Sequence, residues 1–468
     1  FVAGCKTKTS ESPIPYISAL DSAAIVEDSL NNAQRRSLVL GNGDLNALFF
    51  SQDDSLKLRI SKNDVWDARI ETSQDPPMIR FDVRNHSWKG GASRVPSWHE
   101  FEYPLPRSCA IVSIAPTTKG GARKRYNGKL DLRRALATAT DGEGSTTHVR
   151  VLANRNVILI ESKAEVSISQ VPAPYFDAAK EGFTDGVMWI HQVMPGDPDY
   201  EGMEFAVALA TEDNLKTIAV VTSWESGEVL ADAIKLAKET VSLEKEVLIL
   251  EHEARWNRFW SASGVQLADN ILQNWWYRCL YNMSCFCKPG TMAIGLHAGL
   301  ATESVGWHSS YKLNYNTQQT YWPQFVCNHV SDVDPFVKLL KGHLSRAKWL
   351  ARYAYDCDGA YFFSDLFPFE PPDPASSKSN MHRQCSYVPW GYTLGMTSWA
   401  AYHAWLCYKY QPDREYLERE IYPILKETSI FFLDFMSKCK KDPDQKVILG
   451  PSYSPEHGPF GTDNNPFD

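Results

Sequence analysis

Three carboxamide side chains stand close together in the segment Tyr311–Pro323. Asn314, Asn316 and Gln318 occupy alternate positions, and an aromatic pair that includes Trp322 follows them. In an extended segment alternate side chains point the same way, so this spacing predicts three amides on one side of the chain. Amides donate and accept hydrogen bonds without titrating, which favours a ligand rich in hydroxyl groups. A polar loop that satisfies its own backbone is the alternative.

A carboxylate in a restricted loop is the second candidate for chemistry. Glu456 follows Pro455 within Gly450–Pro459, a segment of three prolines and two glycines. Proline fixes φ and glycine supplies unusual backbone angles, so such a loop can hold one side chain rigidly. Partial desolvation beside the aromatic Tyr453 predicts a raised pKa, as a general acid requires. An ordinary exposed glutamate is the alternative.

These two segments resemble glycoside hydrolase family 95, the inverting α-L-fucosidases and α-L-galactosidases. The patterns Tyr-x-x-Asn-x-Asn-x-Gln-x-x-Tyr-Trp-Pro and Pro-Ser-x-Ser-Pro-Glu carry the likeness most specifically. Looser matches, which extend the likeness from about residue 38 onward, are Gly41–Leu45, Ser61–Trp66, Lys288-Pro289-Gly290, Gly299-Leu300, Trp307, Trp399, His403, Trp405 and Asp413.

The resemblance implies a role for each site residue. Glu456 is expected to be the general acid, while Asn314 and Asn316 are expected to position the water and the sugar. An amide cannot accept a proton at neutral pH, so a carboxylate must act as the base, and the resemblance places it beyond Asp468. The expected substrate contacts are Gln318, Trp307, Tyr311, Trp322, Trp399, His403, Tyr453, His457 and Asp365.

The chain departs from the family pattern near the expected sugar. Ser310 and Lys312 stand where the family usually has an acidic residue and a histidine, and Tyr361–Phe367 lacks the usual histidine pair. The resemblance still makes fucose the leading candidate for the sugar despite these departures. The added lysine predicts a preference for an acidic or branched glycan.

Composition indicates a globular protein of two or three domains. The chain has 468 residues, of which 43% are hydrophobic and 22% charged, and its net charge of -8 argues against nucleic acid as a partner. Ten of the fifteen tryptophans lie at or after Trp256. An aromatic C-terminal half suits a glycan cleft, although most of these rings are expected in the core.

The N-terminus resembles the end of a bacterial lipoprotein signal. In Phe1–Cys5, Cys5 would become the lipid-modified residue, and the polar segment Lys6–Ser12 would be a tether. We therefore expect an exported lipoprotein of the bacterial outer membrane or periplasm, with no spanning helix. A chance Ala-Gly-Cys is the alternative. The other nine cysteines match no zinc pattern, and we predict no metal and no cofactor.

The elements that position these residues change character near residue 226. Short β-branched segments separated by turn residues predict a β-sandwich over residues 26–225, after a tether over 1–25. Helical periodicity predicts a linker over 226–264, with helices through Val229–Glu244 and Glu246–Trp260. Further helices are predicted at Ile271–Phe286, Pro335–Tyr355, Tyr392–Tyr410 and Glu415–Met436, the last with Asp413 as its N-cap and a break near Pro423.

The resemblance implies that residues 265–468 belong to an (α/α)6 barrel of the six-hairpin glycosidase type. Twelve barrel helices need on the order of 350 residues, and about 200 follow the linker, so we expect the barrel to be incomplete in this chain. An alternative is that this fragment does not fold by itself, because a half barrel exposes apolar helix faces to solvent.

Two other functions compete with the hydrolase. Another (α/α)6 glycosidase or a disaccharide phosphorylase would share the fold, but no Gly-rich or Ser/Lys cluster clearly supplies a phosphate pocket. A non-catalytic glycan-binding lipoprotein would keep the aromatic residues and lose the acid, and the retention of Glu456 in its frame argues against it. The expected partner is an oligosaccharide or polysaccharide in each case.

Overall fold

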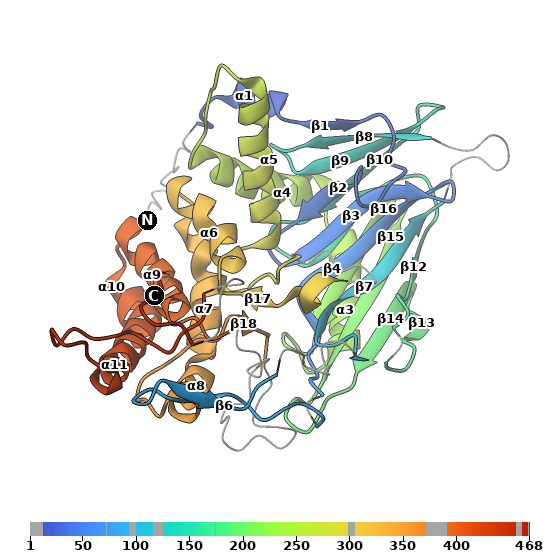
Figure 1. Cartoon of the computed structure of the whole chain (residues 1–468). Coiled ribbons are helices and arrows are strands. Elements are labelled where there is room, and N and C mark those ends of the chain that lie inside the picture. The colour runs from blue at the N-terminus through green and yellow to red at the C-terminus, as the bar shows by residue number, and fades with distance from the viewer. Residues whose placement is uncertain are drawn as a thin grey trace, which may run out of the picture.

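A computed structural model places a β-rich half beside a helical half (Figure 1). The structure describes residues 13–71, 73–92, 100–115, 125–173, 175–297, 305–369, 391–454, 461–466 and 468. Strands dominate the chain as far as Thr222, and helices dominate from Val229 onward. The predicted order of a β-sandwich followed by helices is confirmed. No described helix combines the length and the apolar composition that a membrane-spanning segment needs.

Two antiparallel sheets form the β-rich half. The larger has the order β1-β8-β9-β10-β11-β16-β15-β14-β13, and the smaller has the order β12-β7-β4-β3-β2. Their strands are β1 (Ile25–Glu27), β2 (Leu38–Gly41), β3 (Leu45–Gln52), β4 (Ser55–Asp67), β7 (Leu105–Ile114), β8 (Tyr126–Asp131), β9 (Leu136–Asp141), β10 (Thr146–Val151), β11 (Val157–Glu161), β12 (Val166–Ser169), β13 (Lys180–Thr184), β14 (Val187–Met194), β15 (Met203–Glu212) and β16 (Leu215–Thr222). A short helix α1 (Ile17–Ser22) precedes them, and the hairpin of β5 (Arg80–Asp82) and β6 (Ser87–Lys89) stands apart.

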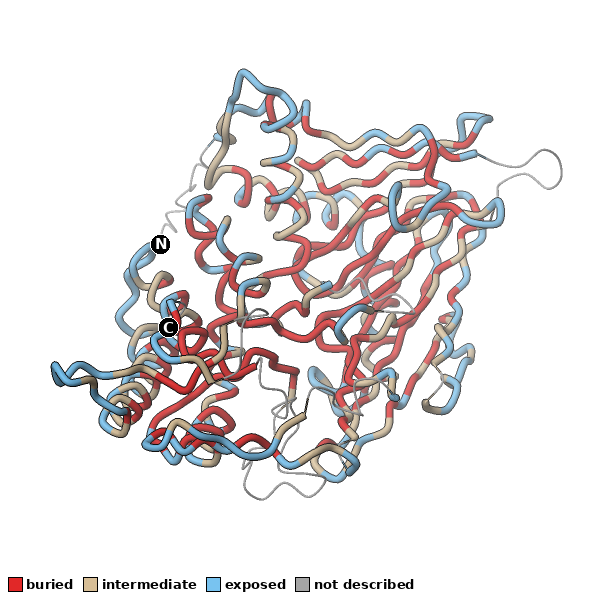
Figure 2. The backbone as a smooth tube through the Cα atoms, viewed as in Figure 1, coloured by how far each residue is buried: buried red, intermediate tan, exposed pale blue. Residues whose placement is uncertain are grey.

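The two sheets pack face to face through alternate side chains. On β4, Leu56, Leu58 and Ile60 are buried, while Lys57 and Arg59 between them are partly exposed. This period of two is the pattern of a strand with one face in the core. Figure 2 shows that buried residues continue along the strands of both sheets and into the helices beside them.

Helix α3 (Val229–Val241) covers the outer face of the larger sheet, on β15 and β16. Ala233 and Ala237 meet Ala206 and Ala208 of the sheet in one buried cluster. These small side chains let the helix approach the sheet closely. The predicted helix is confirmed, although it ends at Val241, and α4 (Lys245–Ser261) follows it as the second predicted linker helix.

The helical half is close to its predicted elements. It contains α5 (Asn270–Phe286), α6 (Asn316–Val326), α7 (Asp334–Gly342), α8 (Leu344–Tyr355), α9 (Gly395–Tyr410), α10 (Arg414–Tyr416), a π-helical turn (Leu417–Ile421) and α11 (Tyr422–Lys438). The single helix predicted over 335–355 is divided between α7 and α8 at His343. Asp413 caps α10 as predicted, since its carboxylate accepts from the backbone N–H of Tyr416 at 3.0 Å.

The expectation that most tryptophans of this half lie in the core is wrong: among those described from residue 256 onward, only Trp256 and Trp260 are buried, and Trp275, Trp307 and Trp322 are exposed. The buried aromatic rings are mainly those of tyrosine and phenylalanine. Trp256 stacks on Tyr281 with ring centroids 5.1 Å apart, and Tyr361 stacks on Tyr392 at 6.0 Å. Trp260 is fully buried and donates from its indole nitrogen to the carbonyl of Leu132 at 3.1 Å, which ties α4 to the larger sheet. These rings therefore serve packing rather than ligand binding.

The two halves are joined where the loop between β2 and β3 meets the end of α5. The backbone N–H of Gly43 donates to the carbonyl of Cys285 at 2.8 Å, and the hydroxyl of Thr291 donates back to the carbonyl of Gly43 at 3.2 Å. A Cβ on Gly41 would lie 2.4 Å from the carbonyl oxygen of Cys285, and Gly43 has φ of +91°. Both positions therefore require glycine.

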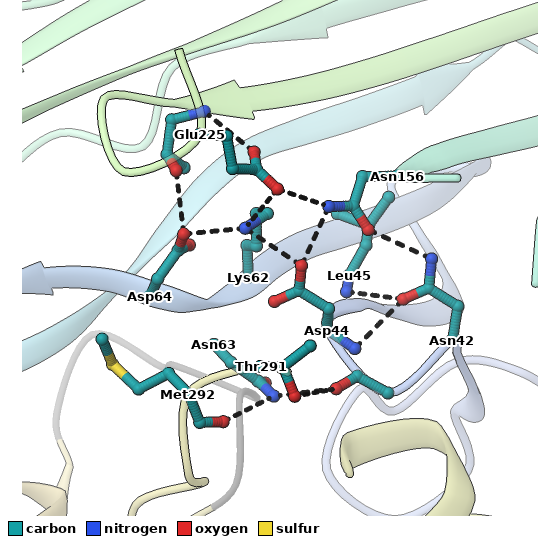
Figure 3. Close-up of polar contacts among 12 residues, drawn as sticks. Asn42, Asp44, Leu45, Lys62, Asn63, Asp64, Asn156, Glu225, Thr291 and Met292 are labelled. Carbon is teal, nitrogen blue, oxygen red and sulfur yellow. Dashed lines mark hydrogen bonds and ion pairs between the residues drawn. The ribbon is translucent and has the colours of Figure 1, made fainter. Parts of the chain in front are cut away.

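Asn63 completes this joint from β4. Its amide nitrogen lies 2.8 Å from the carbonyl oxygen of Phe286 and 3.1 Å from that of Gly43. Figure 3 shows its third contact, with the carbonyl oxygen of Met292 at 3.4 Å. The indole nitrogen of Trp66 donates to the carbonyl of Asn63 at 3.0 Å. The two N-terminal segments that resemble the family's β-sandwich therefore fix the helical half to the sheets.

Candidate active site

A short antiparallel pair anchors the chain just before the asparagines. Strand β17 (Tyr311–Lys312) pairs with β18 (Asp365–Leu366), and Lys312 lies opposite Asp365. The lysine forms an ion pair with this fully buried carboxylate. The hydroxyls of Ser310 and Ser364 donate to the same carboxylate at 2.9 and 2.7 Å.

This cluster corrects two expectations. Asp365 was expected to contact the substrate, but it has no exposed surface and accepts from three donors inside the protein. Lys312 was expected to favour an acidic glycan, but its charge is paired with Asp365. The departures from the family pattern at Ser310 and Lys312 thus belong to one buried cluster that holds the start of the asparagine segment.

The predicted extended arrangement of the three amides is wrong. After β17 the chain turns, and α6 begins at Asn316, so the period of two does not apply. Gln318 is fully buried in α6, and its amide nitrogen donates to the carbonyl of Leu313. Gln318 therefore stabilises the turn from inside the protein, whereas Asn314 and Asn316 are partly exposed.

Asn314 and Asn316 remain partly exposed at the N-terminal end of α6. The side-chain oxygen of Asn314 is buried and has no hydrogen-bond partner among the described residues. Leaving a buried polar atom without a partner costs about 1–3 kcal/mol, and such atoms often mark a position that a water or a ligand fills. An amide oriented in this way can receive a hydrogen bond from water or from a sugar hydroxyl.

An aromatic cluster borders the two asparagines. The ring of Tyr315 lies 5.6 Å from that of Trp322 on α6 and 6.2 Å from that of Trp399 on α9. Trp322 donates from its indole nitrogen to Nε2 of His403 at 2.6 Å, and Nδ1 of His403 lies 2.8 Å from the carbonyl oxygen of Trp399. Three predicted contacts, Trp322, Trp399 and His403, are thus brought together. Tyr315 is a neighbour that the sequence reading missed, because an isolated tyrosine carries no distinctive signal.

These bonds fix the protonation state of His403. An indole nitrogen can only donate, so Nε2 of His403 must accept its hydrogen bond. Nδ1 of His403 must then carry the proton, and it donates a hydrogen bond to the carbonyl of Trp399. Burial lowers the pKa of His403, which favours the same neutral form. The histidine therefore acts as an uncharged link between α6 and α9.

Tyr311 and Trp307 have opposite environments. Tyr311 is fully buried beside Trp66, and its hydroxyl donates to the carbonyl of Ala293 at 2.8 Å, so it serves packing rather than the predicted contact with a sugar. Trp307 is 64% exposed and has φ of +49°, and His308 and Ser309 after it are also left-handed. A bulky residue adopts this backbone region only under strain, which is common at ligand sites.

The loop that carries the predicted acid is described on its two flanks. Glu456 and His457 lie outside the described residues. Ser452 pairs with Thr462 through two backbone hydrogen bonds of 3.0 and 2.9 Å, which bring the flanks together. Tyr453, partly buried on the first flank, accepts through its carbonyl from the hydroxyl of Thr393.

The first flank and the asparagine segment both lie near the start of α9, where the backbone N–H of Leu394 donates to the hydroxyl of Ser452 at 3.3 Å. The carboxylate of Asp468 accepts from the backbone N–H of Gly395, the first residue of α9, at 2.8 Å. Trp399, one turn further along α9, contacts Tyr315 between the two asparagines. Burial raises the pKa of the Asp468 carboxyl against the hydrogen bonds from Ser452 and Gly395, and this role as an anchor is consistent with leaving Asp468 out of the catalytic groups. Within the described residues no group of three or more His, Cys, Asp or Glu could hold a metal ion.

Residues 268–467 match the family model described as the glycosyl hydrolase family 95 catalytic domain. These residues form a divergent catalytic domain of glycoside hydrolase family 95. The chain is 27% identical over 174 residues to "Alpha-L-fucosidase 2" of Arabidopsis thaliana, which covers 36% of this chain and 19% of that protein. It is 23% identical over 255 residues to "Probable alpha-fucosidase A" of Aspergillus niger, which covers 50% of this chain and 31% of that protein.

A solved structure shares the fold of the chain that carries this family 95 domain. A "Putative kojibiose phosphorylase from human microbiome" superimposes with a TM-score of 0.56 at 12% identity, over 93% of this chain and 60% of that chain. At this identity the likeness concerns the arrangement of sheets and helices alone. The chain spans about a fifth and about a third of the lengths of the two fucosidase relatives.

Proposed function

We propose that this chain carries the acid side of a glycoside hydrolase site that releases α-linked L-fucosyl or L-galactosyl residues from glycans. One observation carries the proposal: the Asn314–Asn316 segment contacts Trp399 in the second turn of α9, and the first flank of the Glu456 loop bonds Thr393 and Leu394 directly before α9. Two relatives named as α-fucosidases support the choice of sugar. The (α/α)6 barrel, which the phosphorylase fold likeness supports, would complete the site around α9.

The proposed mechanism is a single displacement with inversion. Glu456 protonates the departing oxygen, while a water on the opposite face of the sugar attacks the anomeric carbon. Asn316 and Asn314 aim this water, and the unpaired amide oxygen of Asn314 supplies one acceptor for it. A carboxylate must take the proton of the water, because an amide cannot accept it at neutral pH.

The substrate contacts follow from exposure. Trp307, Trp322 and Tyr315 each keep a substantial part of the ring accessible. Flat aromatic faces of this kind pack on the C–H groups of a pyranose. We leave Tyr311, Gln318 and Asp365 out of the contacts because all three are buried.

The proposal is tested by Glu456→Gln in the full-length protein, with Glu246→Gln on α4 as the control. Turnover of 2'-fucosyllactose should fall by about two orders of magnitude or more in the first variant, the usual scale for a general acid, and should not change in the second. An aryl fucoside, whose leaving group needs little protonation, should lose less. Equal turnover of wild type and Glu456→Gln on 2'-fucosyllactose would remove Glu456 from the mechanism.

Asn316→Ala separates water positioning from sugar binding. We expect the catalytic rate to fall by at least about tenfold, while calorimetry finds nearly unchanged affinity for the glycan. A collapse of affinity with a surviving rate on bound substrate would make Asn316 a specificity contact instead. Release of fucose 1-phosphate in phosphate buffer would show that the reaction is phosphorolysis and not hydrolysis.

We also propose that Cys5, outside the described residues, carries a lipid anchor on an exported protein. The Ala-Gly-Cys sequence and the polar tether after it support this. Cys5→Ser should move the full-length protein from the membrane fraction to the soluble fraction. An unchanged distribution would exclude the anchor.

A further inference from the structure

A second polar cluster lies in the β-rich half, on β4 and on the segments that follow β2 and β16. The ammonium of Lys62 on β4 is buried among three carboxylates: Asp44 at 3.0 Å, Asp64 at 2.8 Å and Glu225 at 3.2 Å (Figure 3). Asn156 donates to Asp44 at 2.9 Å and to Glu225 at 3.0 Å. The cluster thus holds more negative than positive charge.

One acceptor of this cluster has no donor. Asp64 is 7% exposed, and its Oδ2 accepts from Lys62 and, at 2.8 Å, from the hydroxyl of Thr222. Its Oδ1 is buried without a hydrogen-bond partner among the described residues. This oxygen is enclosed, so the carboxylate of the cluster that a bound molecule can reach is Glu225, whose side chain is 37% exposed and which lines the cavity described next.

The cluster forms one end of a cavity of about 530 Å³ between the sheets and α7. Asp44, Lys62, Asp64 and Glu225 line this end, and Pro335 of α7 belongs to the facing wall. Its volume is within the range of about 300–1,000 Å³ that small-molecule sites occupy. The cavity is large enough for one sugar unit.

An aromatic platform stands beside the acidic end. Trp224 is 51% exposed, although it stacks on Phe369 with centroids 4.3 Å apart and planes 3° apart. Phe369 is itself stacked on Tyr200 at 5.5 Å and is held at φ of +66°. One face of Trp224 is therefore fixed by Phe369, while much of the remaining ring is accessible beside the cavity.

These features select the class of ligand. Excess carboxylate disfavours an anion, and the lysine ammonium already occupies the centre that a metal ion would need. A neutral sugar brings hydroxyl donors for the carboxylate oxygens and C–H groups for the indole face, without a charge to desolvate. We propose that this cavity binds a neutral pyranose unit of a glycan, separately from the site at α9. The inference goes beyond the proposed hydrolysis, because it requires binding and no chemistry.

Fluorine NMR of the full-length protein with 5-fluorotryptophan tests the proposal. Trp224→Phe assigns the Trp224 resonance, and Trp275→Phe assigns an exposed control on α5 that is 62% accessible. Lactose and 2'-fucosyllactose should shift the Trp224 resonance in a saturable way and leave the Trp275 resonance in place. An unmoved Trp224 resonance at saturation of the protein's sugar binding would overturn the proposal.

Variants of the acidic end sharpen the same experiment. Glu225→Ala should weaken the sugar-dependent shift of Trp224 at least about tenfold, while Glu246→Ala should not change it. Asn316→Ala should also leave it unchanged, which separates this cavity from the proposed catalytic site. Circular dichroism checks that each variant is folded. A Trp224 shift with spermidine and none with either sugar would overturn the neutral-sugar assignment.

Discussion

Two buried lysines of this protein have very different partners. Lys312, at the start of the asparagine segment, pairs with one carboxylate that two serine hydroxyls also satisfy. Lys62, in the smaller sheet, faces three carboxylates, one of which keeps an oxygen without a described partner. The first cluster is balanced in charge and its carboxylate is enclosed, whereas the second has excess negative charge and opens on a cavity.

The comparison separates an anchor from a site. A balanced and fully hydrogen-bonded cluster fixes one backbone arrangement and has no capacity left for a ligand. A cluster with unused acceptors beside an accessible indole can still form bonds with a sugar. We therefore assign the Lys312 cluster to positioning Asn314 and Asn316, and the Lys62 cluster to binding.

Lys62→Met should have the largest effect. Burial alone would lower the pKa of Lys62, and its three carboxylates more than offset this and raise it. Removing the ammonium leaves the buried carboxylates of Asp44 and Asp64 uncompensated beside the exposed Glu225, so we expect the free energy of unfolding to fall by about 5 kcal/mol at pH 7. Urea denaturation measures it, with Lys57→Met on the same strand as the control. A loss below about 1 kcal/mol would show that the cluster is not buried as described.

Lys312→Met should come next, at about 4 kcal/mol, because it strands the single buried carboxylate of Asp365. Since this cluster positions the asparagines, the catalytic rate of the remaining folded protein should fall more than its affinity for 2'-fucosyllactose. Lys426→Met on α11 is the exposed control. If the Lys312→Met protein were less stable but had unchanged kinetics, the cluster would stabilise the fold without positioning the asparagines.

Asp64→Asn should change how stability depends on pH. Burial raises the pKa of Asp64 from 3.8 to about 6, and Asp44 and Glu225 add to this against the attraction of Lys62. The folded state therefore binds this proton more tightly than the unfolded state. The protonated Asp64 carboxyl stabilises the fold at low pH, and this stabilisation is lost as the pH rises from about 4 to about 6. The difference corresponds to about 3 kcal/mol. Urea denaturation between these pH values should show a smaller fall for Asp64→Asn than for wild type and the exposed control Asp185→Asn, and equal falls would contradict the buried environment.

Ser310→Ala should have the smallest effect, about 1–2 kcal/mol. It removes one hydroxyl donor from Asp365 and leaves Lys312 and Ser364 in place. Ser364→Ala is the matched variant from the other side of the carboxylate. Thermal unfolding of both proteins should give similar small losses, and a loss as large as that of Lys312→Met would mean that the hydroxyl, rather than the charge pair, dominates.

Local sequence signals predicted the fold better than the site. Helices with clear periodicity and the Asp413 cap were found close to their observed bounds, because these signals act within one or two turns. The sequence did not predict which way the three amide side chains point. Helix α6 begins at Asn316, directly after the β17–β18 pair, and that pair joins segments far apart in the sequence. The partner of Lys312 lies 53 residues away, and the partner of Trp322 lies 81 residues away. No spacing rule relates such residues, so only the resemblance could place some of them at one site.

The anomeric form of the first product tests the central claim most directly. Proton NMR should follow the first minutes of reaction of the full-length protein with 2'-fucosyllactose, before mutarotation mixes the anomers. A water held by Asn316 and Asn314 opposite Glu456 predicts that β-L-fucose appears first and that Asn316→Ala slows its appearance. Early α-L-fucose, or fucose 1-phosphate when phosphate is present, would contradict the account.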